Sequence, residues 1–68
     1  MQNGSVKMWD ASKGCGFIVT EDEEELFVNA NDLHPSVPVK RLIEGQKGRF
    51  DVRSDFKGDR AVNVRIVR

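Results

Sequence analysis

The sequence has few residues that could form the disulfide bonds or metal sites that stabilise many small proteins. Its 68 residues include one cysteine, one histidine and no tyrosine. A single cysteine, Cys15, excludes an internal disulfide framework, and Cys15 with His34 cannot supply the four ligands of a usual structural zinc site. We therefore expect no metal, a fold that is held by its core alone, and a reducing compartment, most simply the cytoplasm.

Long hydrophobic runs are also missing. No stretch approaches the ~18 apolar residues that a membrane span needs, and the N-terminal MQNGSVK lacks the apolar region of a signal peptide. We expect no membrane association, and we take Met1 as a natural start and the chain as a whole protein. Since a typical domain has roughly 100–150 residues, we expect one domain over residues 1–68, without room for a cofactor cavity or a multi-step enzyme.

The chain has no excess of either charge, because eleven basic residues match eleven acidic ones. The charges are nevertheless unevenly distributed. Residues 1–34 have a net charge of −5 and residues 35–68 a net charge of +5. Zero net charge argues against strong non-specific binding of polyanions, whereas the uneven distribution allows a local basic surface in the folded protein.

Six glycines and two prolines interrupt the chain every few residues, which favours short strands over long helices. We expect five strands, at Ser5–Asp10, Cys15–Thr20, Leu26–Asn29, Arg49–Arg53 and Ala61–Val67. The last two alternate apolar and polar residues with period two, as half-buried strands do. In the fourth, Phe50 and Val52 face the core; in the fifth, Val62, Val64 and Ile66 share one face and Ala61, Asn63 and Arg65 the other.

Two segments leave alternatives open. In the first strand, alternation places Val6 and Met8 on one face and Lys7 and Trp9 on the other, but a one-residue bulge would exchange Met8 and Trp9. The Glu-rich segment 21–33 has helical propensity, yet its Leu26-Phe27-Val28 triplet favours a strand after an acidic loop. With a long loop at 34–45, these elements predict an all-β fold, a small five-stranded antiparallel barrel, because closure protects the sheet edges.

The most informative cluster is Lys13-Gly14-Cys15-Gly16-Phe17-Ile18. Glycines on both sides of one residue would let a nucleic-acid backbone approach closely, and Phe17 would present a flat surface on which any base can stack. The alternative is a tight turn followed by a core strand. Ile18, Leu26 and Val28 already supply inward positions, so we expect Phe17 and Phe27 to point outward.

Four segments in chain order resemble a bacterial cold-shock domain. VKMWDASKGCGFI is similar to the family's opening V-K-W-F-N and first ribonucleoprotein motif K-G-F-G-F-I, and Leu26-Phe27-Val28-Asn29 to the second motif, V-F-V-H. Arg41–Gln46 resembles L-x-E-G-Q, and the segment after Phe56 resembles K/R-G-P-Q-A-x-N-V. The resemblance covers nearly the whole chain and implies an OB-fold barrel of the cold-shock type.

The resemblance also implies a function, which is binding of single-stranded RNA or DNA with little sequence preference, as an RNA chaperone or antiterminator and not as an enzyme. No cofactor is implied. The expected nucleic-acid-binding residues are Lys7, Trp9, Lys13, Phe17, Phe27, Asn29 and Arg60. Additional candidates are Met8, Cys15, Phe56 and Lys57. We expect a monomer, with a swapped dimer as the alternative.

Several positions depart from the family pattern. The family's tryptophan falls on Met8 and the next phenylalanine on Trp9; Cys15, Asn29, Ala30 and Val39 occupy positions that are aromatic or histidine in the family. Asp59 and Arg60 replace its proline and glutamine, and Gly48 replaces a branched apolar residue and can mark a bulge. Most stacking residues are absent, so we expect altered or weakened binding. The alternative is a protein-interaction module with little nucleic-acid binding.

Each of these residues also has a simpler interpretation. Lys7 and Lys13 are solvated lysines by default, and Cys15 is a small spacer unless it is a redox switch. The acidic run 21–25 is a solvated loop or a barrier that repels phosphate. Phe56 either caps the barrel end or contacts a base.

Overall fold

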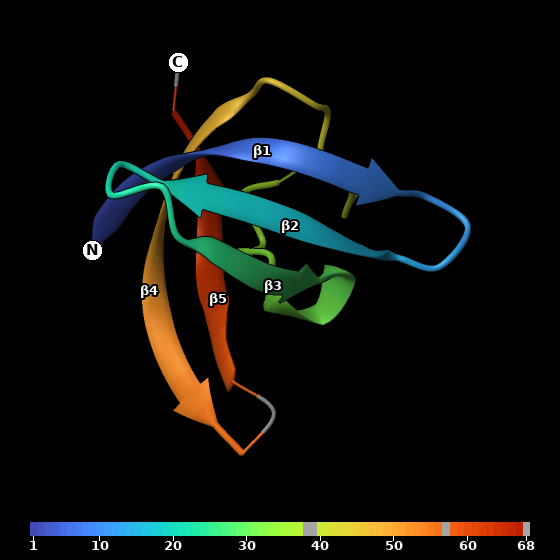
Figure 1. Ribbon diagram of the computed structural model, residues 1–68. Coiled ribbons are helices and arrows are strands. Elements are labelled where there is room, and N and C mark those ends of the chain that lie inside the picture. The colour runs from blue at the N-terminus through green and yellow to red at the C-terminus, as the bar shows by residue number, and fades with distance from the viewer. Residues whose placement is uncertain (38–39, 57, 68) are drawn as a thin grey trace.

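A computed structural model describes residues 1–37, 40–56 and 58–67 of the chain; the candidate Lys57 lies outside the described residues. The described residues form five strands, β1 (Gln2–Asp10), β2 (Cys15–Thr20), β3 (Glu25–Asn29), β4 (Lys47–Asp55) and β5 (Gly58–Ile66). A short 3₁₀ helix, η1 (Ala30–Asp32), follows β3. The expected strands are thus confirmed (Figure 1). Only β2 has the expected bounds; β1, β3, β4 and β5 begin earlier than the sequence patterns indicate, and β5 ends one residue earlier.

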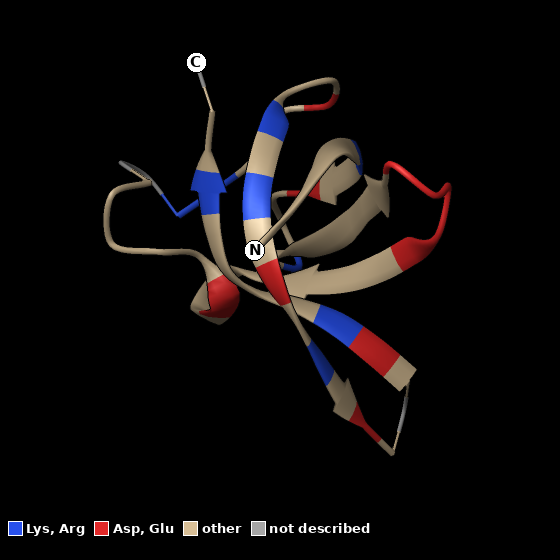
Figure 2. Ribbon diagram, turned by 90° about the vertical axis from the view of Figure 1, so that its left-hand side faces the viewer, with Lys and Arg blue, Asp and Glu red and all other residues tan. Residues whose placement is uncertain are grey.

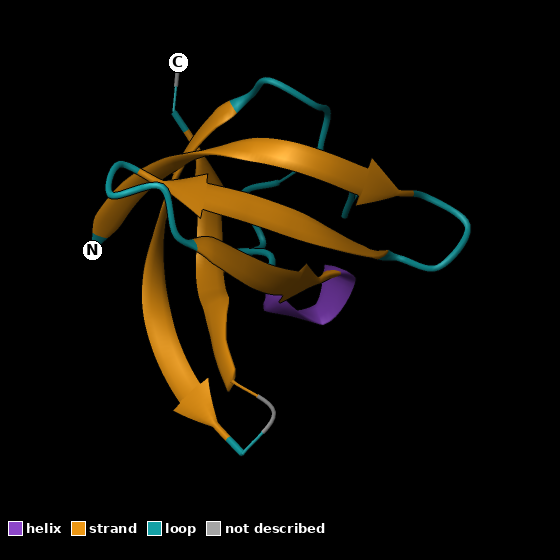
Figure 3. Ribbon diagram, viewed as in Figure 1, coloured by secondary structure: helices purple, strands orange, loops and turns teal. Residues whose placement is uncertain are grey.

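The strands close into a barrel in the order β1-β2-β3-β5-β4, with β4 pairing back onto β1. The predicted five-stranded barrel is therefore confirmed. One pair is not antiparallel, because β3 meets β5 in parallel at Phe27 and Arg60. β1, β2 and β3 lie side by side as one layer, and the β4–β5 hairpin crosses behind them and extends past β3 (Figures 1 and 3).

One core fills the barrel. Phe50, Ile18, Leu26, Val28 and Val64 are fully buried within it. Leu33, Val37 and Leu42 are also buried, so the long segment between β3 and β4 contributes to the core although its described part holds no strand. Among the described residues, no helix is long and apolar enough to cross a membrane.

A bulge in β1 decides which side chains face outward. Val6 pairs with Ile18 but Met8 already pairs with Phe17, so Lys7 is an extra residue on β1. Strict alternation in this strand is wrong, and the bulged alternative holds. Met8 lies on the outer face beside Phe17, whereas Trp9 is half-buried and packs against the core.

A second irregularity changes the expected faces of β5. Arg49 pairs with Arg65 but Asp51 pairs with Val62, and Asn63 has φ 51° in the left-handed region. The extra residue on β5 turns Ala61 as well as Val64 into the core, so the expected grouping of Ala61 with Asn63 and Arg65 is wrong.

Gly48 does not mark a bulge, because it pairs regularly with Ile66 and the register shift lies beyond it, between Arg49 and Asp51. A Cβ on Gly48 would lie 2.9 Å from the Arg65 carbonyl oxygen, so glycine fits a close backbone approach there. Val52 is exposed, contrary to expectation. It pairs with Ala61 on β5.

Candidate nucleic-acid interface

The outer face of β1–β3 presents three apolar side chains on adjacent strands, which we call the β1–β3 platform: Met8, Phe17 and Phe27. Phe17 pairs with Met8 on one side and with Phe27 on the other. Their exposed fractions are 41% for Met8, 36% for Phe17 and 39% for Phe27. The two phenyl rings meet edge to face with centroids 5.9 Å apart, so the expected outward direction of both phenylalanines is confirmed.

A shallow depression adjoins the platform. It is lined by Phe17, Phe27, Asn29, Asp55, Phe56, Gly58, Asp59 and Arg60. Phe56 is 98% exposed, so it does not cap the barrel and instead stands at the rim. The depression therefore combines aromatic surface with two carboxylates and one guanidinium.

The two glycines before Phe17 have structural reasons in the chain itself. Gly14 has φ 66° in the turn that joins β1 to β2, where its N–H donates to the Asp10 carbonyl. A Cβ on Gly16 would lie 2.1 Å from the Met8 carbonyl oxygen and 2.9 Å from the Trp9 Cα. The close approach that needs Gly16 is thus between β2 and β1, so a nucleic-acid backbone is not required to explain this glycine.

The same turn is held by Asp10. Its Oδ1 accepts hydrogen bonds from the Ser12 hydroxyl at 2.7 Å and from the N–H groups of Ser12 and Lys13. These bonds, above all that from the Ser12 hydroxyl, lower the pKa of Asp10 below its ordinary value. Within the described part of the chain, no carboxylate lies within ion-pair distance of the Lys13 ammonium group, so this cation is available for a phosphate.

Arg60 is held by carboxylates. Its Nη2 lies 2.6 Å from Oδ2 of Asp32 and its Nη1 lies 3.8 Å from Oδ2 of Asp55. The hydrogen bond and the charge of Asp32 raise the pKa of the Arg60 guanidinium. The guanidinium is thus tied to the protein, which differs from the free phosphate contact that sequence reasoning suggested.

Asp32 is a residue that sequence reasoning missed. Its Oδ2 also accepts the N–H of Asn29 at 3.1 Å, while Oδ1 of Asn29 accepts the N–H of Asn31, a reciprocal cap on η1. The Asx-x-x-Asp spacing from Asn29 to Asp32 could have indicated the cap. No local pattern indicates the partner Arg60, which lies 28 residues further along the chain.

Two other candidates occupy intermediate environments. Lys7 forms an ion pair with Glu25, Nζ to Oε1 3.0 Å, with both side chains about half exposed; such pairs contribute about 0–1 kcal/mol and give way readily to another anion. Cys15 is half-buried and pairs with Asn29 on β3. Asn29 lines the depression.

The position of Trp9 differs most from the expected one, because Trp9 was expected on the outer face with the other binding residues. Its indole packs against the core, and its Nε1 is buried without a hydrogen-bond partner among the described residues. Met8 occupies the outward position instead. The described residues contain no group of three or more His, Cys, Asp or Glu that could hold a metal ion.

Comparisons with known proteins agree with this geometry. The model of the 'Cold-shock' DNA-binding domain family matches residues 2–67. The chain is 44% identical over 64 residues to cold shock protein 1 of Lactiplantibacillus plantarum, covering 94% of this chain and 96% of that protein. It is 45% identical over 65 residues to a cold shock-like protein of Aquifex aeolicus, covering 94% and 91%, and 42% identical over 64 residues to the major cold shock protein of a Streptococcus pyogenes strain, covering 94% of each. With the closed barrel and the exposed aromatic pair, these matches show that the chain belongs to the cold-shock DNA-binding domain family.

Proposed function

We propose that this protein binds single-stranded RNA or DNA through the β1–β3 platform, with little sequence preference, and acts as an RNA chaperone or antiterminator and not as an enzyme. The observation that carries the proposal is the pair Phe17 and Phe27, half-exposed on adjacent strands with their rings in contact. Every base has a π-face, so stacking on these rings contributes about 1–3 kcal/mol per base without selecting a base.

The charges around the platform support a strand whose bases face inward. Asp55 and Asp59 line the depression, and carboxylates there disfavour phosphates. Lys13 stands at the turn that begins β2, and Lys7 lies on β1 in an ion pair that a phosphate can replace. We propose these two lysines as the phosphate contacts, with Asn29 and Phe56 beside a base in the depression. Arg60 shapes the depression through Asp32.

We expect the affinity to be modest. Met8 is exposed but has no flat ring, and Trp9 is turned toward the core. Phe17 and Phe27 are thus the two stacking rings of the platform, and a platform with more aromatic rings would bind more bases. The absence of even two stacking residues, at about 1–3 kcal/mol each, lowers affinity by roughly one to four orders of magnitude, although such losses need not add.

The test is fluorescence anisotropy with a labelled oligothymidine and a labelled oligouridine, each compared with the corresponding duplex, over a series of salt concentrations. We expect both single strands to bind, the duplexes to bind more weakly, and log K to fall linearly with log salt by about 0.7 per phosphate contacted. Absence of binding by folded protein at high micromolar strand would refute the proposed function.

A second candidate is a protein-interaction module on the same face. Zero net charge and the carboxylates that line the aromatic depression favour it. The two functions differ in their salt dependence, because an apolar protein contact barely responds to salt whereas phosphate contacts respond strongly. Strand binding that is insensitive to salt, or absent, would favour this candidate.

The exposed position of Met8 predicts a gain of function. Met8→Trp places a flat ring directly opposite Phe17 on the outer face, where it can stack on one more base. We expect the affinity for a short oligothymidine to rise by about 5- to 150-fold, the equivalent of about 1–3 kcal/mol.

The matched control is Met8→Leu, which keeps an apolar side chain without a flat ring. Its affinity should stay near that of the parent protein. Equal affinities for Met8→Trp and Met8→Leu would show that bases do not stack at this position. Thermal unfolding of both variants checks that the β1 bulge survives the substitution.

Further expectations stay predictions: a single cold-shock domain over residues 1–68, a monomer, and a cytoplasmic location. Sedimentation equilibrium distinguishes a monomer from a swapped dimer.

A further inference from the structure

A group of basic side chains lies outside the platform, on the outer face of the β4–β5 hairpin near its junction with β1. We call it the β4–β5 basic patch: Lys47, Arg49 and Arg65. Arg49 and Arg65 are direct cross-strand partners, and Lys47 lies two residues before Arg49 on the same face of β4. All three are exposed. In Figure 2 the blue bands of β4 and of the end of β5 lie next to each other, while the red loop after β2 lies on the opposite side.

The patch has no ion pair with the described part of the chain. Among the described residues, no carboxylate lies within 4.0 Å of the charged nitrogens of Lys47, Arg49 or Arg65. Asp51, the next outward residue on β4, lies 3.9 Å from the N-terminal amine and accepts a hydrogen bond from Asn63.

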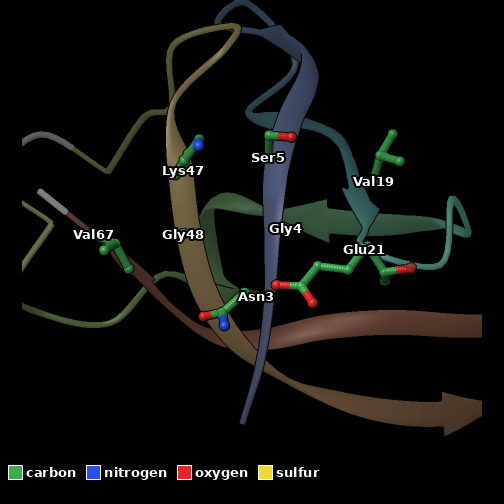
Figure 4. Close-up of a pocket in the computed structure, with 9 residues that line it drawn as sticks. Asn3, Gly4, Ser5, Val19, Glu21, Lys47, Gly48 and Val67 are labelled. Carbon is green, nitrogen blue, oxygen red and sulfur yellow. The ribbon is translucent and has the colours of Figure 1, made fainter.

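The patch borders a second depression, which Asn3, Ser5, Glu21, Lys47 and Val67 help to line (Figure 4). Lys47 stands beside Ser5, its partner on β1. Glu21 enters from the end of β2 but forms no ion pair with Lys47 within the described part of the chain. The Lys47 ammonium group at the β4 side of this depression thus has no ion-pair partner among the residues that the structure describes.

Two like charges directly opposite each other in a sheet are destabilising. The other such pair on this hairpin, Arg53 and Arg60, is relieved because Asp32 and Asp55 hold the Arg60 guanidinium. No described carboxylate forms an ion pair with Arg49 or Arg65 in the same way. An anion from outside the chain, one with charges repeated along its length, would neutralise Lys47, Arg49 and Arg65 together.

We propose that the β4–β5 basic patch binds the sugar-phosphate backbone of a single strand that continues beyond the β1–β3 platform. β1 joins the two surfaces, because it pairs with β2 along Met8 and with β4 along Asn3 and Arg49. The acidic segment 21–25 disfavours the route over the β2–β3 loop, so the strand crosses β1 toward β4. This inference rests on the proposed function and adds a second, length-dependent contact to it.

The test compares a short oligothymidine of about 5 nucleotides with a long one of about 16, near the limits for one OB fold. Anisotropy is measured over a salt series with strand in excess. For the parent protein, we expect the salt slope to be steeper by about 2 for the long strand, since each of three cations contributes about 0.7. Between about 50 and 200 mM salt, this difference is an additional loss of about 20-fold in affinity.

The triple variant Lys47→Gln/Arg49→Gln/Arg65→Gln should remove this difference while short-strand binding is unchanged. The matched control is Arg53→Gln, an exposed arginine four residues from Arg49 on the same strand. It should leave the difference between the two strand lengths as in the parent protein. Thermal unfolding confirms that each variant is folded, and we expect the triple variant to be no less stable because it loses like-charge repulsion.

The outcomes separate the two proposals. If neither strand binds the parent protein, the proposed function fails, and the length-dependent contact fails with it. If the short strand binds, and for each strand length the salt slope of the triple variant equals that of the parent protein, the platform binds nucleic acid but the basic patch does not. If sedimentation shows low-salt self-association that the triple variant abolishes while strand affinities are unchanged, the patch binds the acidic loop of a second copy, and the phosphate contact is refuted.

Discussion

Replacing Phe17 or Phe27 by alanine is expected to weaken binding of a short oligothymidine by about 5- to 150-fold, the equivalent of about 1–3 kcal/mol per lost stacking surface. The two rings touch each other, so the loss of binding free energy in the double variant should differ from the sum of the losses in the two single variants. Contacting residues commonly couple by about 0.5–3 kcal/mol. The measurement is anisotropy at low salt, where even a weakened complex is detectable.

Two controls separate stacking from folding and from general hydrophobic contact. Phe17→Leu keeps an apolar side chain against Met8 and Phe27 but removes the flat ring, so it should lose most of the affinity while the melting temperature changes little. Ile43→Ala removes an exposed apolar side chain that belongs neither to the platform nor to its depression, and should bind as the parent protein does. Parent-like affinity in Phe17→Ala and Phe27→Ala would exclude the platform as the binding surface.

The second large effect concerns stability. Gly16→Ala should destabilise the domain by about 3 kcal/mol or more, because its Cβ would lie 2.1 Å from the Met8 carbonyl oxygen, and only a backbone shift at the β1 bulge can relieve this contact. A domain of this size has a stability near ~3–5 kcal/mol. The variant should therefore be largely unfolded at room temperature, which chemical denaturation followed by circular dichroism measures.

Gly45→Ala is the matched control. Gly45 has φ 88° with no atom within 4 Å of the added Cβ, so this substitution changes only the backbone preference and should cost about 1–3 kcal/mol. A Gly16→Ala variant that is as stable as Gly45→Ala would mean that β1 and β2 separate without loss, and the account of Gly16 as a close contact between strands would be wrong.

Local patterns in the sequence were sufficient for the barrel. Period-two alternation and the glycines and prolines between the segments indicate strands, so all five strands could be expected near their observed positions. The outward direction of Phe17 and Phe27 could be predicted for the same reason, because Ile18, Leu26 and Val28 filled the inward positions. The resemblance to cold-shock domains, carried by four collinear motifs, was strong enough to identify the family.

Tertiary structure decided whether Met8 or Trp9 faces outward. A bulge inserts one residue without changing the local pattern, so the sequence allows either Met8 or Trp9 on the platform; pairing with β2 selects Met8. The extra residue at Asn63 likewise turns Ala61 inward through the register of β4 against β5.

Ion pairs between residues far apart in the chain also could not be predicted from the sequence. Arg60 meets Asp32 only because β3 and β5 close the barrel in parallel, and Arg49 faces Arg65 only through the register of the β4–β5 hairpin. The sequence by itself determined the strands, the inward positions of Ile18, Leu26 and Val28, and the family. Which cations are neutralised and which remain available to a phosphate depends on strand pairing, because electrostatic partners are chosen by proximity in space.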